Sequence, residues 1–313
     1  MSGEAPAPDL SIVLVNWNAL DLTIAALASI DAQTTGITYE GFVVDNGSTR
    51  DTGLERLPEQ FPWVTLIVND GNLGFSRANN QAFARARGRY ILALNTDTIQ
   101  IADVLGDAVR YMDTQPTVGA LGVRHLNNDE ARSTQASAFA FPRPSQELLG
   151  LLWLRQPDDP TIWPDETAAD LDVGWLCGSF LMIRRETLDQ VGPLDERFFV
   201  YEEDIDWCLR ARQAGWVVRF RPALSMVHIG HASEPHIRDK SFMHFRSHLT
   251  YLRKHHGVLV AGAHYLAMVI RLTLSTLWSG LKWLMGRETG AAFFPRCRRQ
   301  VEFVLLRPGR TGV

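Results

Sequence analysis

Residues 10–18 read LSIVLVNWN, an aliphatic and β-branched run that ends in two asparagines around a tryptophan. The run predicts a buried strand, and Asp21–Ala32 after it has the apolar spacing of a helix. The same alternation continues in the strands expected at Phe42–Val44, Val64–Val68 and Tyr90–Leu94 and in the helix expected at Asn72–Arg87. Short apolar strands that alternate with helices are typical of an α/β fold with a mostly parallel sheet flanked by helices.

The pattern becomes less regular after the fourth strand. We expect a helix at Asp103–Asp113, a strand at Val118–Val123, a Pro- and aromatic-rich region with a short helix up to about Asp172, a buried strand at Val173–Arg184, and short strands at Trp216–Arg221 and Leu224–His228.

Charge divides the 313-residue chain into two parts. The part from residue 236 onward has 13 Lys and Arg against 3 Asp and Glu, which leaves 18 against 32 before it. We therefore expect one domain at residues 1–235 and a basic, helical C-terminal region at residues 236–313. The acidic first part argues against nucleic acid as a partner, and the basic, Trp-containing second part indicates an anionic membrane surface.

Several common classes are excluded by what the sequence lacks. The three cysteines have no CxxC spacing, so we expect neither a disulfide framework nor a zinc site, and a reducing compartment follows. The N-terminus has no signal-peptide pattern. No GxGxxG follows the first strand, which argues against a dinucleotide fold, and the absence of GxxxxGK[ST] excludes a P-loop.

Polar residues follow the expected strands, where parallel sheets bind their ligands. Asp45 could accept hydrogen bonds from a ribose or a base, or it could cap the turn Asp-Asn-Gly-Ser that it begins. Asp97, with Asn95 two residues before it, offers oxygen ligands suited to Mg²⁺ or Mn²⁺, or it could cap the following helix. Both alternatives are open for both residues.

An acidic and aromatic stretch, GPLDERFFVYEEDIDW, occupies Gly192–Trp207. Its carboxylates precede a helix that we expect to end at Gly215, so helix capping explains part of the cluster. Upstream, Gly178 and Ser179 leave room for a ligand near the backbone or mark a bulge. His228, in an apolar context, is either a core residue or a ligand.

Six motifs in this order resemble family 2 glycosyltransferases of the rhamnosyltransferase-like branch. They are NWN at 16–18, VVDNGS at 43–48, NLGFSRANN at 72–80, LNTD at 94–97, the block at 192–216 and VHIGHAS at 227–233. The resemblance covers about residues 10–235 and implies the GT-A fold, a Rossmann-like mixed sheet. Two departures stand out. Asn-Thr-Asp replaces the more frequent Asp-x-Asp or Asn-Pro-Asp, and Arg77 stands where small residues are common.

The resemblance assigns roles to individual residues. It implies a nucleotide-sugar site at Asn16, Trp17, Asn18, Asp45, Asn46, Arg77, Asn95 and Thr96, with Asp45 accepting from a base N3–H. It implies a Mg²⁺ or Mn²⁺ ion held by Asp97 and His228. It implies Asp204 as the general base, with Glu203 orienting the acceptor hydroxyl or the base. Acceptor contacts would come from Trp175, Gly178, Ser179, Tyr201 and Trp207.

One base implies direct displacement at the anomeric carbon and inversion of its configuration. The expected reaction is the transfer of L-rhamnose from dTDP-rhamnose to a lipid-linked or nascent cell-surface polysaccharide. A UDP-hexose is the alternative donor, since the base contact does not separate thymine from uracil. A nucleotide-sugar-binding scaffold without catalysis is an alternative of another class, and the Glu203-Asp204 pair argues against it.

The apolar stretch Val258–Met285 carries His264, Arg271 and Lys282, with Trp278 and Trp283 near its end. Because a central Arg is costly in hydrocarbon, we expect one or two helices lying in the membrane interface on the cytoplasmic side rather than one full span. Arg296, Arg298, Arg299, Arg307 and Arg310 would add attraction to anionic lipid. A homodimer formed through this helix is the structural alternative.

Overall fold

The computed structural model of the chain describes residues 6–154, 159–163, 165–230, 240–286, 289, 293–294, 297–298, 300–301 and 305. Two compact units make up the chain. The sheet unit comprises residues 1–141 and 160–236, and the helical unit comprises residues 142–159 and 237–313. Residues 142–159, which the predicted division places with the first domain, thus cluster with the C-terminal region.

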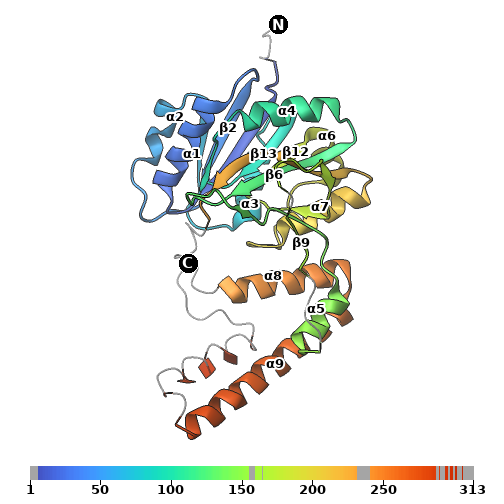
Figure 1. Ribbon diagram of the computed structural model, residues 1–313. Helices are drawn as coiled ribbons and strands as arrows, with labels where there is room; N and C mark the ends of the chain where they lie inside the picture. Colours follow the sequence, from blue (N-terminus) through green and yellow to red (C-terminus); the bar gives the residue numbers. More distant parts are fainter. Residues whose placement is uncertain are drawn as a thin grey trace. The chain divides into compact units, whose positions relative to one another are not determined.

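The first half of the sheet unit alternates strands and helices (Figure 1). Its elements are β1 (Leu10–Asn16), α1 (Leu20–Gln33), β2 (Tyr39–Asp45), a 3₁₀ helix (Leu54–Arg56), α2 (Leu57–Gln60), β3 (Val64–Val68), α3 (Phe75–Phe83), β4 (Tyr90–Leu94), β5 (Thr98–Ile99) and α4 (Val104–Thr114). Strands β1, β2, β3 and β4 are parallel and adjacent in the order β4-β1-β2-β3. The predicted parallel α/β half is therefore confirmed.

The second half completes the main sheet and adds a small one. Its elements are β6 (Val118–Leu126), β7 (Thr134–Gln135), β8 (Ala138–Phe139), β9 (Thr161–Ile162), β10 (Leu171–Asp172), β11 (Trp175–Leu176), β12 (Phe180–Arg184), α6 (Arg185–Val191), α7 (Glu203–Gln213) and β13 (Val217–His228). Strand β12 runs antiparallel between β4 and β6, and β13 is parallel to β6. Strands β11, β8 and β9 form a separate antiparallel sheet.

Two strand predictions were wrong in detail. The strand expected at Val173–Arg184 is broken at residues 177–179, so β11 and β12 belong to different sheets. The two strands expected between Trp216 and His228 are one strand, β13, whose register against β6 shifts between Arg221 and Ser225. An irregularity of this kind bends a strand without ending it, which a local sequence pattern does not distinguish from a turn.

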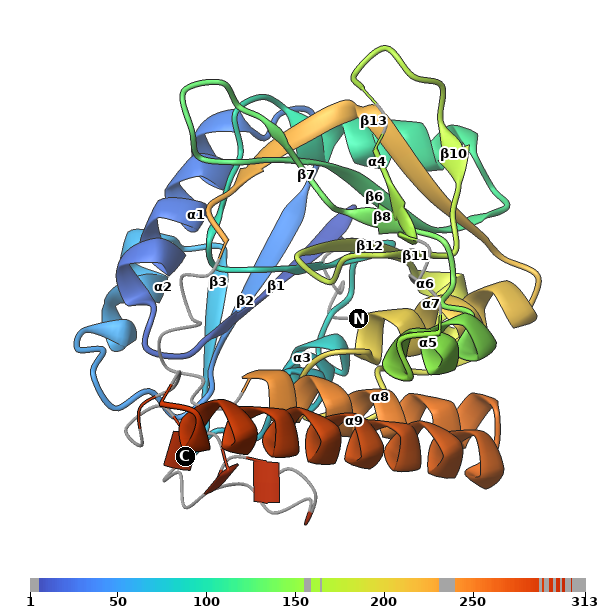
Figure 2. The same ribbon diagram turned by 60° about the horizontal axis from the view of Figure 1, so that its bottom comes forward.

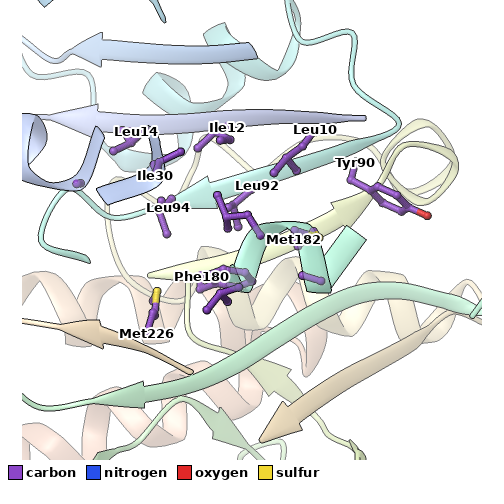
Figure 3. Packing of buried hydrophobic residues seen from close by; sticks show 14 of the residues in the cluster. Leu10, Ile12, Leu14, Ile30, Tyr90, Leu92, Leu94, Phe180, Met182 and Met226 are labelled. Atoms are coloured by element: carbon purple, nitrogen blue, oxygen red, sulfur yellow. The ribbon is translucent and has the colours of Figure 1, made fainter. Parts of the chain in front are cut away.

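The core forms two layers because strand side chains alternate between the faces of the sheet. Leu10, Ile12 and Leu14 of β1 pack with α1, α2 and α4 on one face, as Figure 3 shows for part of this cluster. Val13 points to the other face, where α3, α6 and α7 supply the partners. Both faces of the central strands are covered, which explains why these strands read as continuous apolar runs.

Among the residues that the structure describes, the helical unit has the helices α5 (Pro144–Leu151), α8 (Lys240–His255) and α9 (Val258–Leu284). Helix α9 packs on both α5 and α8, and its course beside α8 can be followed in Figure 2. Helix α9 is 27 residues long and has a mean hydropathy of 1.6 over its most apolar 18 residues, so it is long and apolar enough to cross a membrane. Arg296, Arg299, Arg307 and Arg310 lie outside the described residues.

Candidate active site

Asp97 and His228 lie side by side at the ends of two strands. Thr98 of β5 pairs with His228 of β13, and this pairing brings the residue before β5 to the last residue of β13. His228 Nε2 is 3.3 Å from Asp97 Oδ1, and both side chains are largely buried. An imidazole nitrogen and a carboxylate oxygen at this separation suit a divalent cation, so the two residues predicted to share a metal do meet.

Gln135 of β7 sets the orientation of His228. The Gln135 Nε2 amide donates to the His228 carbonyl oxygen at 2.8 Å, so Gln135 Oε1 must be the atom that faces His228 Nδ1, also at 2.8 Å. That oxygen can only accept, which places a proton on Nδ1 and the lone pair of a neutral ring on Nε2. The lone pair is therefore directed at Asp97, as in a metal-binding histidine held by a second polar group.

A second buried histidine, His125 of β6, lies behind His228. The two ring centroids are 5.4 Å apart, and His125 Nδ1 is 3.2 Å from Ser179 Oγ. Burial, and then the proximity of His228, lower the pKa of His125 well below its usual value, so this ring is neutral at pH 7. Ser179 thereby connects the Asp97–His228 pair to the loop between β11 and β12.

Asp204 occupies the first turn of α7 and is held by backbone amides. Its Oδ2 accepts from the Gly178 N–H at 2.9 Å, and its Oδ1 accepts from the Ile205 N–H at 2.8 Å. The break at 177–179 therefore positions Gly178 against Asp204. Tyr201 and Glu202, directly before α7, both have φ of 69°, a left-handed conformation that costs energy in non-glycine residues. Strain of this kind is typical of functional loops.

Burial controls the charge of the Glu203-Asp204 pair. It raises the pKa of Asp204 to about 6, against the lowering effect of the Gly178 and Ile205 amides. Burial, and then the Asp204 charge, raise the pKa of Glu203 well above its usual value. Glu203 Oε2 is buried without a hydrogen-bond partner among the described residues. The pair therefore holds a proton more readily than two ordinary carboxylates would.

The two other acidic or aromatic residues of this helix are structural. Asp206 is fully buried and pairs with Arg210 at 2.9 Å, one turn along α7. Trp207, predicted to contact the acceptor, is 0% exposed and donates from Nε1 to the Gly192 carbonyl at 2.9 Å. A side chain buried this completely packs in the core, so we leave Trp207 out of the acceptor site.

The loops after β1 and β2 form one hydrogen-bonded network. Asn16 Nδ2 donates to Asp45 Oδ1 at 3.0 Å and to Asp51 Oδ2 at 2.8 Å, and Thr23 donates to Asn16 Oδ1. Asp45 also accepts from the Ser48 hydroxyl at 2.5 Å. Asp45 therefore caps its turn, and Asn16, which is fully buried, acts by holding Asp45 in place.

Most of the other residues predicted to bind the nucleotide lie in these loops or directly after β4. Asn18 Oδ1 accepts from the Thr49 and Arg50 amides, and Trp17 beside it is partly buried. Asn46 is buried and bonded to Asn72. Asn95 and Thr96 immediately precede Asp97, with the Asn95 N–H donating to Ser179 O at 3.1 Å.

Three remaining candidates occupy different surroundings. The Arg77 side chain of α3 is exposed, and its Nε lies 3.9 Å from Glu196 Oε2. Trp175 stacks on Phe139 with ring centroids 4.0 Å apart. Tyr201 is partly buried at the strained turn before α7.

Comparison with known proteins identifies the family. The model for "Glycosyl transferase family 2" matches residues 11–192, more than half of the chain. The chain belongs to this family. A curated relative, N-acetylglucosaminyl-diphospho-decaprenol L-rhamnosyltransferase of Mycobacterium tuberculosis, is 30% identical over 242 residues, which are 71% of this chain and 74% of the relative. Rhamnosyltransferase WbbL of Escherichia coli is 30% identical over 60% of this chain and 73% of its own length.

Solved structures agree with this at the level of the fold. The mannosyltransferase PcManGT from Pyrobaculum calidifontis, in complex with GDP-Man and Mn²⁺, matches with a TM-score of 0.55 and 19% identity over 96% of this chain and 86% of its own. The chain is thus a family 2 glycosyltransferase with the GT-A fold and rhamnosyltransferase relatives, as the motifs indicated.

Two residues of the site were missed in the sequence. Gln135 lies on a two-residue strand within the Pro- and aromatic-rich region, where no periodicity points to a role. His125 lies just beyond the strand expected at Val118–Val123 and reads as a core residue. Only the chemistry of the two side chains could have pointed to them: Gln135 can bond to a histidine and His125 can bond to a serine, near the predicted metal ligand His228.

Proposed function

We propose that this glycosyltransferase moves L-rhamnose from dTDP-rhamnose to a lipid-linked or nascent cell-surface glycan, with inversion at the anomeric carbon and with a divalent metal bound at Asp97 and His228. The observation that carries the proposal is the connected arrangement of the two halves of the site. Asp97 lies next to His228, whose ring is close to that of His125. His125 contacts Ser179, and the neighbouring Gly178 donates to Asp204.

The residues around Asp97 fit a metal. Asp97 supplies a carboxylate oxygen, and Gln135 leaves the lone pair of His228 Nε2 directed at it. When bound, Mg²⁺ or Mn²⁺ would stabilise the negative charge that develops on the leaving diphosphate. In the proposed arrangement, Asp45 receives the base N3–H, and Asn16 and Ser48 keep its carboxylate in one orientation.

Asp204 would remove the proton of the acceptor hydroxyl at its Oδ atoms. With a pKa of about 6 it is mostly ionised at pH 7 and is a stronger base than an ordinary aspartate. Glu203, with its raised pKa, would remain protonated and donate a hydrogen bond from Oε2, the atom that has no partner among the described residues. This hydrogen bond would orient either the acceptor or Asp204.

The helical unit would bind the membrane that carries the acceptor. Exposed apolar residues recur along α9 at three-, four- and seven-residue intervals, at Leu259, Leu266, Ile270, Leu274, Leu277, Leu281 and Leu284. Such residues share one face of a helix. Arg271, near the middle of α9, donates to the Gly150 carbonyl at 3.3 Å and lies over the Trp153 ring within the helical unit. These features support a helix that lies in the membrane interface, which the proposal places on the cytoplasmic side.

Donor binding and turnover test the proposal together. Calorimetry with dTDP-rhamnose, UDP-glucose and GDP-mannose, with and without Mn²⁺, should give binding that needs the metal and is tightest for dTDP-rhamnose. Transfer of rhamnose to a membrane extract should follow. If a UDP-hexose binds more tightly than dTDP-rhamnose, the proposed donor changes to a UDP-hexose, because Asp45 would contact the N3–H that uracil and thymine share. Binding without transfer to any extract would favour a scaffold.

A further inference from the structure

The helical unit contains a second group of possible metal ligands, distinct from the Asp97–His228 pair. Glu147 of α5, His248 of α8 and His264 of α9 each direct one ligand atom to a common point, and these atoms lie within 4.8 Å of one another. His248 Nε2 is 3.4 Å from Glu147 Oε2, and His264 Nε2 is 4.0 Å from the same oxygen. The three residues come from three helices that are distant in sequence.

A hydrogen bond of His264 shows which of its two ring nitrogens faces the Glu147 carboxylate. Its Nδ1 is 2.9 Å from the Val260 carbonyl oxygen, which can only accept, so Nδ1 carries a proton. The lone pair of a neutral ring is then on Nε2. The side chain is 1% exposed, and neither His264 Nε2 nor Glu147 Oε2 has a hydrogen-bond partner among the described residues. Two lone pairs therefore face each other at a buried position, an unfavourable contact that a bound cation would relieve.

The chemistry of the three ligand atoms agrees with a bound cation. Two imidazole nitrogens and one carboxylate oxygen form a ligand set that zinc binds well, and a backbone carbonyl that holds the other nitrogen of a ligating histidine is a common support for such a site.

The spacing also suits zinc. Bonds of about 2.0–2.1 Å in a tetrahedral site separate neighbouring ligand atoms by about 3.3 Å. The distance from His248 Nε2 to Glu147 Oε2 is close to this value. The distance from His264 Nε2 to the same oxygen is longer by less than 1 Å. Small side-chain rotations would close the site around an ion, with water as a fourth ligand.

We propose that Glu147, His248 and His264 bind one Zn²⁺ ion that fastens α5 to α8 and α9. Metal sites of this kind add folding free energy because the unfolded chain does not present its ligands together. The ion would tie residues 142–159, which interrupt the sheet unit in sequence, to the C-terminal helices. The helical unit would then keep its structure through a metal that takes no part in sugar transfer.

Zinc binding by the full chain tests this directly. The test uses Asp97→Ala as the background, so that the donor-side pair does not contribute. After treatment with a chelator, Zn²⁺ alone is titrated by calorimetry, and metal content is measured after dialysis. We expect one Zn²⁺ per chain, and Zn²⁺ should raise the thermal unfolding temperature.

Two ligand variants and one control complete the experiment. Glu147→Gln and His248→Gln should each weaken Zn²⁺ binding by at least about tenfold and abolish the thermal shift. His244→Gln, an exposed histidine one turn before His248 on α8, should change neither. Circular dichroism reports whether each variant is folded. The proposal is overturned if micromolar Zn²⁺ does not bind, or if both ligand variants bind it as the control does. No outcome depends on the donor or on turnover.

Discussion

His228 Nε2 lies 3.3 Å from Asp97 Oδ1, with the orientation of the ring imposed by Gln135 from the opposite side. The two residues are distant in sequence and become neighbours because β5 pairs with the end of β13. This relationship is the geometric basis for the proposed metal-dependent donor site, and the first two predictions concern its parts.

Asp97→Ala should abolish the metal dependence of donor binding, because it removes the carboxylate that faces His228. His228→Ala should act in the same way. Calorimetry with the donor and Mn²⁺ measures the effect, and Asp129→Ala, at an exposed turn, is the matched control. If the Asp97 variant binds donor as before, the metal site lies elsewhere. If His228→Ala loses stability but keeps full turnover, His228 is only a core residue.

Gln135→Ala should weaken Mn²⁺ binding by about 10–100-fold, because the ring of His228 loses the acceptor that keeps its proton on Nδ1. Thr134→Ala, the neighbouring position on β7, is the control. The measurement is a Mn²⁺ titration in the presence of the nucleoside diphosphate. Equal Mn²⁺ affinity in both variants would remove Gln135 from the site.

Asp204→Asn should lower turnover by about a hundredfold or more and leave donor binding intact, because the amide keeps the shape of the side chain and loses its basicity. Steady-state kinetics and donor calorimetry measure the two effects separately. Glu203→Gln, which resembles the protonated carboxyl, should cost much less. If turnover is near normal in Asp204→Asn and is lost in Glu203→Gln, the general base is Glu203 and not Asp204.

Turnover should fall as pH decreases through about 6, because Asp204 becomes protonated there and not near its usual value of 3.8. Below that pH the rate should fall by about tenfold per unit. The raised pKa also means that the folded state binds more protons than the unfolded chain between pH 3.8 and about 6. The free energy of unfolding should therefore decrease as pH rises through this interval. A profile that is flat down to pH 5 contradicts the assignment.

Binding to anionic vesicles should depend on α9 and should weaken with salt, because screening reduces attraction between exposed charges. Leu274→Glu combined with Leu277→Glu should reduce vesicle binding by at least about tenfold, since each leucine contributes on the order of 1–2 kcal/mol when buried in lipid. Val68→Glu, an exposed apolar residue of the sheet unit, is the control. Vesicle co-sedimentation gives the readout, and equal loss in the control variant would refute the role of α9.

The strands of the first half could be predicted closely from sequence. Val64–Val68 and Tyr90–Leu94 have the predicted bounds. Tyr90–Leu94 is buried throughout, because a strand covered on both faces consists of apolar residues and ends where polar residues begin. The order of the motifs also identified the family and the fold. These features depend on residues that are close in sequence, where periodicity and turn chemistry act locally.

The geometry of the site required the tertiary structure. The Gly178–Asp204 hydrogen bond depends on a break between two strands that cannot be recognised in the apolar sequence of residues 173–184. The pKa of Asp204 depends on burial more than on its position in the helix. Trp207 belongs to the core although the family resemblance implied an acceptor contact for it. Gln135, His125 and the Glu147–His248–His264 group act through partners far away in the chain. Such contacts arise from strand pairing and helix packing, which bring together residues that no local pattern relates.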